Sequence, residues 1–150
     1  MSVENVSGYP VKLDLAYDPV GDLWVEVVSP SEVAIGLDSI GTESSGSLAQ
    51  LSMVPPGQVI ARGEPLGSLE AEKFVGPVLA PISGTVLELN TQALANPSAV
   101  HADPYGAWLV RLEPSRLSEE LENLVRGTEA VREYFAGKVA DYKLKGILAE

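Results

Sequence analysis

One lysine stands out among the side chains that can do chemistry. The 150 residues include five lysines, and Lys73 is the only one between Lys12 and Lys138. It lies beside Glu70 and Glu72 and is followed by a Gly-Pro pair. A lysine between two short strands, next to such a turn, is expected at a hairpin tip with its ammonium in water. On spacing alone it is interpreted as a solvated turn residue.

The remaining side chains offer little catalytic chemistry. The chain has no cysteine and one histidine, His101, which excludes disulfides, thiolate zinc sites, iron–sulfur clusters, thiol nucleophiles and His-rich metal sites. No metal site is therefore expected, and His101, which precedes Ala102 and Asp103, is interpreted as a surface or packed residue. Ser83 and Gly84 lack the Gly-x-Ser-x-Gly elbow of hydrolases, and no glycine-rich phosphate loop occurs.

The composition indicates an acidic globular protein. Its 10 Lys+Arg and 21 Asp+Glu give a formal charge of −11, and 45% of the residues are hydrophobic. This charge argues against nucleic-acid and anionic-membrane partners. The N-terminus lacks the features of a secretion or transit signal, and no apolar stretch approaches the ~18 residues that span a bilayer. We expect a cytoplasmic protein without a membrane partner.

The elements that must position this lysine are predicted to be strands. Between residues 11 and 112, short apolar runs at period two alternate with Gly and Pro, which is typical of an all-β sandwich or barrel. The segment 38–47, rich in small polar residues, is either a loop or a short capped helix. Trp24 and Trp108 are expected to fill the core. The expected strands cover residues 13–17, 23–28, 32–37, 46–54, 65–70, 84–89 and 108–112, with another beginning near Val78.

Beyond Pro114 the pattern becomes helical. We expect an amphipathic helix that is capped by Ser115 or Ser118 and ends at Gly127, with Thr128 capping a second helix. The apolar stripes are Leu117, Leu121, Leu124 and Val125 in the first helix, and Val131, Tyr134, Phe135, Val139 and Tyr142 in the second. These helices either cover the β core or form a pair that docks a partner.

Turn motifs frame Lys73 on both sides. Pro55-Pro56-Gly57 and Gly63 precede it, and Ala80-Pro81-Ile82-Ser83-Gly84 follows it. This frame resembles the lipoyl and biotinyl carrier module, in which a strand ending in Glu-x-x-Lys and a Pro-x-Ser-Gly hairpin present one lysine for a cofactor. Gly84 is expected to need either a positive φ or a close backbone approach at this turn.

Further residues narrow the resemblance to the glycine cleavage system H protein, from Leu15 to Ser115. Asn90, Pro97 and the stretch Asp103-Pro104-Tyr105-Gly106-Ala107-Trp108 match that family's pattern. The matching glycines are Gly36, Gly46, Gly57, Gly63 and Gly67. The resemblance implies a mainly β fold, a flattened β barrel/sandwich hybrid of the lipoyl-domain kind with one or two C-terminal α-helices. We expect a single domain over 1–150, with a carrier core at 11–112 and a helical extension at 115–150.

The resemblance also implies a covalent lipoate on Lys73. Glu70 and Glu72 would form an acidic recognition patch around the arm, unless they only keep the hairpin soluble, and His101 would help to shelter the loaded cofactor. The protein would be a noncatalytic carrier whose arm shuttles a sulfur-bound intermediate, an aminomethyl group, between enzymes. Its partners would be a lipoate ligase or lipoyltransferase, glycine decarboxylase, aminomethyltransferase and dihydrolipoyl dehydrogenase.

Departures from the family pattern leave alternatives open. Asp22-Leu23-Trp24 stands where the family has His-Glu-Trp, and Ala71-Glu72-Lys73-Phe74 stands where it has Ser-x-Lys-Ala. The chain also continues past the family's usual terminus. A second interpretation is therefore a lipoate-binding sulfur carrier of a heterodisulfide-reductase-like sulfur oxidation pathway, with that complex as its partner. A third, an unmodified interaction domain that lost its cofactor, is opposed by the intact Glu70-x-x-Lys73 frame.

Overall fold

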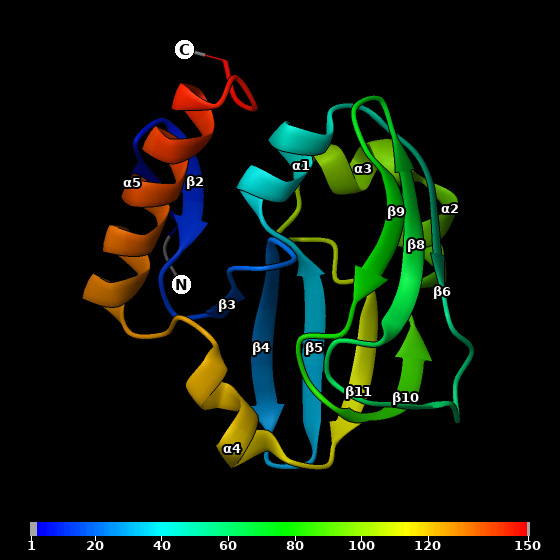
Figure 1. Ribbon diagram of the computed structural model, residues 1–150. Helices are drawn as coiled ribbons and strands as arrows, with labels where there is room; N and C mark the ends of the chain where they lie inside the picture. The colour runs from blue at the N-terminus through cyan, green and yellow to red at the C-terminus, as the bar shows by residue number, and fades with distance from the viewer. Residues whose placement is uncertain (1–2, 150) are drawn as a thin grey trace.

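The computed structural model describes residues 3–149, which are built mainly of antiparallel strands (Figure 1). Six strands form the larger sheet, in the order β3-β4-β5-β11-β10-β7. These strands are β3 (Ala16–Asp18), β4 (Leu23–Ser29), β5 (Glu32–Leu37), β7 (Val59–Ile60), β10 (Gly84–Leu89) and β11 (Val110–Pro114). A smaller sheet, β6-β8-β9, consists of β6 (Leu48–Met53), β8 (Pro65–Ala71) and β9 (Val75–Leu79).

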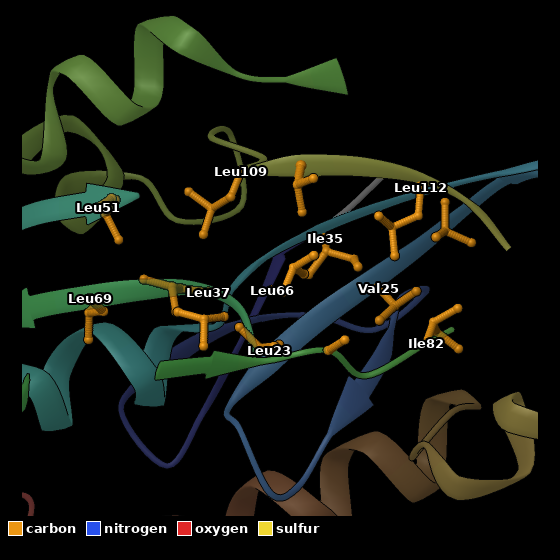
Figure 2. Close-up of a cluster of buried hydrophobic side chains, with 14 of the residues drawn as sticks. Leu23, Val25, Ile35, Leu37, Leu51, Leu66, Leu69, Ile82, Leu109 and Leu112 are labelled. Carbon is orange, nitrogen blue, oxygen red and sulfur yellow. The ribbon is translucent and has the colours of Figure 1, made fainter. Parts of the chain in front are cut away.

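The two sheets enclose the main hydrophobic core. Val25, Ile35 and Leu112 of the larger sheet cluster with Leu51 and Leu69 of the smaller sheet, and each is at most 5% exposed (Figure 2). Burying one such side chain contributes about 1.5–3 kcal/mol. The period-two pattern of the sequence is thus satisfied by two facing sheets, which agrees with the predicted flattened sandwich.

A second hydrophobic cluster joins helix α5 (Thr128–Leu144) to the N-terminal hairpin of β1 (Val3–Val6) and β2 (Tyr9–Lys12). Figure 1 shows α5 beside this hairpin, on the β3 side of the larger sheet. The Phe135 ring meets the Tyr17 ring edge to face, with centroids 4.8 Å apart. The predicted stripe of the second helix is confirmed, because Val131, Phe135 and Val139 are buried in this cluster.

The shorter helices connect the strands. The segment 38–47 contains α1 (Ser39–Ser45), and the Asp38 side chain caps it by accepting a hydrogen bond from the Gly41 N–H at 2.8 Å. The short helices α2 (Thr91–Ala95) and α3 (Pro97–Ala102) follow β10. Across residues 3–149, no helix is both long and apolar enough to cross a membrane.

The first C-terminal helix is shorter than predicted. α4 (Leu117–Glu120) passes into a 3₁₀ turn, η1 (Leu121–Asn123), and the chain is then extended. Val125 and Tyr17 exchange backbone hydrogen bonds of 2.8 and 2.9 Å, which pull this stretch onto β3. Long-range pairing therefore overrides the local helical period.

The predicted helix caps are also wrong. α4 begins without a side-chain cap, so neither Ser115 nor Ser118 has that role. Gly127, with φ +95°, is the N-cap of α5 and does not end a helix. Thr128 is the first helical residue of α5 and makes no capping hydrogen bond. The left-handed backbone of Gly127 sets the sharp entry into α5.

Most predicted strand ranges coincide with observed strands, except in two respects. The range 13–17 is wrong in its first part, because residues 13–15 form a turn before β3. The hairpin β1–β2 and the two-residue strand β7 were not predicted, since such short strands leave little periodicity to detect.

The expectations for the two tryptophans and for Gly84 have different outcomes. Trp24 is buried, and its indole N–H donates to the carbonyl of Pro104 at 3.0 Å. Trp108 is only half-buried, with the Arg111 guanidinium 4.3 Å from its ring centroid. At Gly84 the close backbone approach is confirmed, because a Cβ there would lie 2.3 Å from the carbonyl oxygen of Glu113.

Candidate functional site

Lys73 lies at the tip of the β8–β9 hairpin, as the sequence predicted. Ala71 donates its backbone N–H to the carbonyl of Phe74 at 2.8 Å, which closes a two-residue tip formed by Glu72 and Lys73. The Lys73 side chain is exposed. Neither tip residue has a positive φ, so the turn is not one of the mirror-image types that suit a two-residue hairpin. The tip therefore needs support from another part of the chain.

That support comes from the end of α1. Lys73 donates its backbone N–H to the Ser45 carbonyl at 2.8 Å, and Glu72 donates its own to the Ser47 carbonyl at 2.9 Å. Gly46 lies between these acceptors with φ +78°, and a Cβ on it would be 2.6 Å from Oε1 of Glu72. These contacts fix the backbone of the tip and leave the Lys73 ammonium in solvent.

A cleft of about 530 Å³ opens beside Lys73, which is one of its lining residues. Its other walls come mainly from α1, the β3–β4 turn, strand β9 and residues at and after the C-terminal end of α5. This volume is within the range of about 300–1,000 Å³ that small-ligand pockets have. The apolar lining residues are Val20, Leu23, Leu37, Leu69, Phe74, Pro77, Val78, Leu79 and Ile147.

A nearly buried ion pair forms the β3–β4 side of the cleft. The Lys138 ammonium of α5 is bonded to the Asp22 carboxylate and also donates to the Pro19 carbonyl at 2.6 Å. The Tyr142 hydroxyl donates to the other carboxylate oxygen of Asp22 at 3.2 Å. Burial raises the pKa of Asp22, and the adjacent ammonium of Lys138 opposes this effect. Asp22 itself has φ +56°, an uncommon conformation for a non-glycine residue.

Asp38 places a second carboxyl group behind this pair. It is completely buried, and burial together with the charge of Asp22 raises its pKa to about 7. Its Oδ1 accepts from the Gly41 N–H at 2.8 Å, whereas no donor from residues 3–149 reaches its Oδ2. A buried carboxyl with one oxygen unpaired favours the neutral form.

The predicted site residues are only partly brought together. Glu72 shares the tip with Lys73, but Glu70 is absent from the cleft lining and instead borders a shallow hollow with Gln50 and Ser68. His101 lies half-buried in the last turn of α3, and it too is absent from the cleft lining. The recognition roles of Glu70, Glu72 and His101 stay predictions.

The ion pair that borders the cleft was not predicted from the sequence. Asp22 was noted only as part of a departure from the family pattern, and Tyr142 belongs to a predicted apolar stripe, so neither was connected with Lys138. Lys138 lies 116 positions from Asp22, and no local signal connects them. The one usable hint is a charged residue, Lys138, on the same helical face as Tyr134 and Tyr142.

The arrangement presents the Lys73 amine beside the cleft. Among the described residues, no group of three or more His, Asp or Glu side chains is placed to hold a metal ion. The chain has no thiol, and the carboxylate that borders the cleft is already paired with Lys138. What the site offers is an exposed lysine on a fixed backbone, next to an apolar cleft of ligand size.

Comparisons with known proteins point in one direction. The family model described as "Glycine cleavage H-protein" matches residues 15–136. The chain is 37% identical to a glycine cleavage system H protein 2 of Aquifex aeolicus, over 87% of this chain and 81% of that protein. It is 30% identical to a probable glycine cleavage system H protein 2 of Saccharolobus solfataricus, over 99% of this chain and 94% of that protein.

A solved structure agrees with these sequence matches. The crystal structure of a glycine cleavage system H protein from Mycobacterium marinum superposes with a TM-score of 0.72 and 27% identity, covering 87% of this chain and 99% of that chain. The matches share one family name, so the comparisons do not favour the sulfur-carrier alternative.

Proposed function

Because the chain belongs to the glycine cleavage H-protein family, whose members carry covalently attached lipoate, we propose that Lys73 is its lipoyl attachment site. The protein is a carrier component of the glycine cleavage system, and its family implies partners such as glycine decarboxylase and aminomethyltransferase. The observation that carries the proposal is the presentation of this single lysine on a fixed tip beside the cleft.

The residues present fit a lipoyl group. An amide bond to Lys73 removes the ammonium charge and leaves an apolar acyl chain beside an apolar cleft. When bound, the group supplies a redox-active disulfide, which a chain without cysteine lacks. Ser45 and Ser47 hold the tip through their carbonyl groups, so the attachment point keeps its position relative to the cleft.

The finer assignments follow from the same proposal. The chain alone is noncatalytic, since its own residues only hold, orient and shield the arm. A lipoate ligase or lipoyltransferase attaches the group, and dihydrolipoyl dehydrogenase reoxidises it. Residues 11–112 act as the carrier core of one domain and 115–150 as its helical extension. The compartment is the cytoplasm, and Glu70, Glu72 and His101 contribute to recognition around the arm.

Mass spectrometry tests the attachment site. Protein coexpressed with a lipoate ligase should gain one lipoyl increment on the peptide that contains Lys73, and its formal charge should change from −11 to −12 because one ammonium becomes a neutral amide. Lys73→Arg should abolish the increment, whereas the control Lys143→Arg should keep it. An unmodified wild-type chain, or a lipoyl group on another lysine, would refute the proposal.

A further inference from the structure

The tip that carries Lys73 projects beyond the ladder of the smaller sheet. The pairing of β8 with β6 ends at Ala71, and its pairing with β9 ends at Glu70. The two tip residues, Glu72 and Lys73, therefore lie past the ladder, and both donate their backbone N–H groups to the connection between α1 and β6. Figure 1 shows this α1–β6 connection, residues 45–47, passing beside the β8–β9 tip.

Gly46 gives the α1–β6 connection a backbone shape that other residues resist. Its φ of +78° and ψ of −159° lie in a region that is essentially restricted to glycine. The carbonyls on either side of it, those of Ser45 and Ser47, are the two acceptors of the tip. A Cβ at this position would lie 2.6 Å from Oε1 and 3.0 Å from Cβ of Glu72. A side chain on Gly46 would therefore strain the connection and also push the tip away from it.

The α1–β6 connection is held by α1, which is anchored in the interior of the protein. Gly46 donates its N–H to the Thr42 carbonyl at 3.1 Å, at the end of the helix. Ile40 is completely buried in the hydrophobic cluster that includes α5, and the Ser39 hydroxyl donates to the Pro10 carbonyl at 2.6 Å. The backbone position of the tip is therefore set by α1 as well as by β8 and β9.

We propose that Gly46 is a positioning residue for lipoyl attachment, because it lets the α1–β6 connection hold the tip and so sets where the Lys73 amine meets the attaching enzyme. The inference rests on the proposed attachment at Lys73. In the ligase reaction, the neutral amine attacks the acyl carbon of a lipoyl adenylate, the acyl–phosphate bond breaks, AMP leaves, and the nitrogen releases a proton as the amide forms. Such an attack depends on alignment, so a displaced amine reacts more slowly even when the carrier still binds.

Steady-state lipoylation of the unmodified carrier by a lipoate ligase, with lipoate and ATP, tests this role. Intact mass spectrometry measures the rate. Gly46→Ala should lower kcat roughly tenfold and leave the KM for the carrier within about twofold, because the alignment is lost and the binding surface is kept. Gly63→Ala is the matched control and should keep both constants. Gly63 also has a positive φ, +89°, but it precedes β8 at the end opposite the tip, and a Cβ there would meet no described atom within 4 Å.

Amide hydrogen exchange gives a readout that does not depend on the ligase. In the unmodified protein, the N–H groups of Glu72 and Lys73 should exchange faster in Gly46→Ala than in the wild type or Gly63→Ala, because their bonds to the α1–β6 connection are weakened. Adding Glu72→Ala to Gly46→Ala removes the contact at Oε1 but keeps the backbone strain. The kcat of this double variant should lie between those of Gly46→Ala and Glu72→Ala. This comparison replaces the single variant if Gly46→Ala melts below the assay temperature.

The possible outcomes separate the positioning role from the attachment itself. A kcat for Gly46→Ala equal to that of the wild type would overturn the positioning role and leave the attachment at Lys73 intact. A loss that appears only as a higher KM would overturn it too, since partial unfolding raises the apparent KM by lowering the fraction of competent carrier. A wild-type chain that the ligase does not modify at Lys73 would instead overturn the attachment, and the positioning role with it.

Discussion

Two turns border the cleft, and a charged side chain of each, Lys73 in one and Asp22 in the other, lines it. At the β8–β9 tip, Lys73 is exposed while its backbone N–H is bonded to α1. At the β3–β4 turn, Asp22 is nearly buried and paired with Lys138. In the first turn, backbone hydrogen bonds hold the chain and the charged group stays in water. In the second turn, the ion pair itself holds the chain. A side chain that must be modified by another enzyme belongs in the first setting.

The difference predicts opposite sensitivities to substitution. Removing a charge that water already solvates changes the free energy of unfolding very little. Removing one partner of a buried ion pair leaves the other charge buried without a partner or water, which lowers the free energy of unfolding. With the proposed attachment at Lys73, a substitution there should remove function without loss of stability, whereas a substitution at Lys138 should lower stability without altering the attachment site.

The largest effect is expected for Lys138→Met. The substitution leaves the Asp22 carboxylate buried without its cation and should lower the free energy of unfolding by about 3–5 kcal/mol in urea denaturation. The matched control is Lys145→Met, which breaks the exposed pair with Asp141 and should cost less than about 1 kcal/mol. Equal losses of free energy of unfolding in the two variants would show that the Lys138–Asp22 pair contributes no more to stability than an exposed pair does.

A pH series examines the buried turn further. The carboxyl of Asp38 has an ordinary pKa of 3.8, and burial raises it to about 7 in the folded chain. The folded state then holds a proton that the unfolded chain has released, so this group makes the free energy of unfolding fall as pH rises from about 4 to about 7. Asp38→Asn has no titrating group at this position. Its free energy of unfolding, relative to that of the wild type, should therefore rise by roughly 2–4 kcal/mol over that interval.

The readout is the difference in free energy of unfolding between Asp38→Asn and the wild type at pH 4.5 and pH 8. This comparison cancels the carboxylates that both proteins share. Asn keeps an acceptor for the Gly41 N–H, so the helix cap is retained. A difference that does not change with pH would show that Asp38 titrates normally and does not contribute to the electrostatics of this turn.

The same contrast explains what the sequence could predict. The Lys73 tip was predictable because its flanking strands and framing glycines are local in sequence, although the expected Gly76-Pro77 turn lies within β9 and the tip is formed by Glu72 and Lys73. The ion pair on the other side was not, because Lys138 and Asp22 are far apart in the chain and meet only when α5 docks. The predicted length of the first C-terminal helix was wrong for a related reason, because the Val125 backbone is hydrogen-bonded to Tyr17 on a distant strand. Features set by neighbouring residues could be predicted from the sequence, whereas contacts between residues far apart in the chain could not.

A functional assay should sharpen the comparison at the tip. Phe74 is 44% exposed at the cleft, where the family pattern has a small residue, and it places a ring next to the proposed attachment site. We expect the lipoylated protein to support glycine–bicarbonate exchange with a standard glycine decarboxylase roughly tenfold less well than a typical family member. Phe74→Ala, alone or with Glu72→Val, should recover part of the loss. Full activity of the unaltered chain would show that these side chains do not affect docking.

The smallest effect on the free energy of unfolding is expected for Lys73→Arg. Measuring this variant together with Lys138→Arg compares the two turns directly. Both substitutions keep the positive charge. At the exposed tip the longer guanidinium remains in water and the backbone bond to Ser45 is unaffected, so the free energy of unfolding should stay within about 0.5 kcal/mol of the wild type. At Lys138 the larger group must fit among oxygens that enclose a compact ammonium, which should cost about 1–3 kcal/mol through overpacking. Urea denaturation of the two variants measures both values. A loss at Lys73 as large as that at Lys138 would mean that the tip lysine takes part in the fold, and its assignment as a freely presented attachment site would then be wrong.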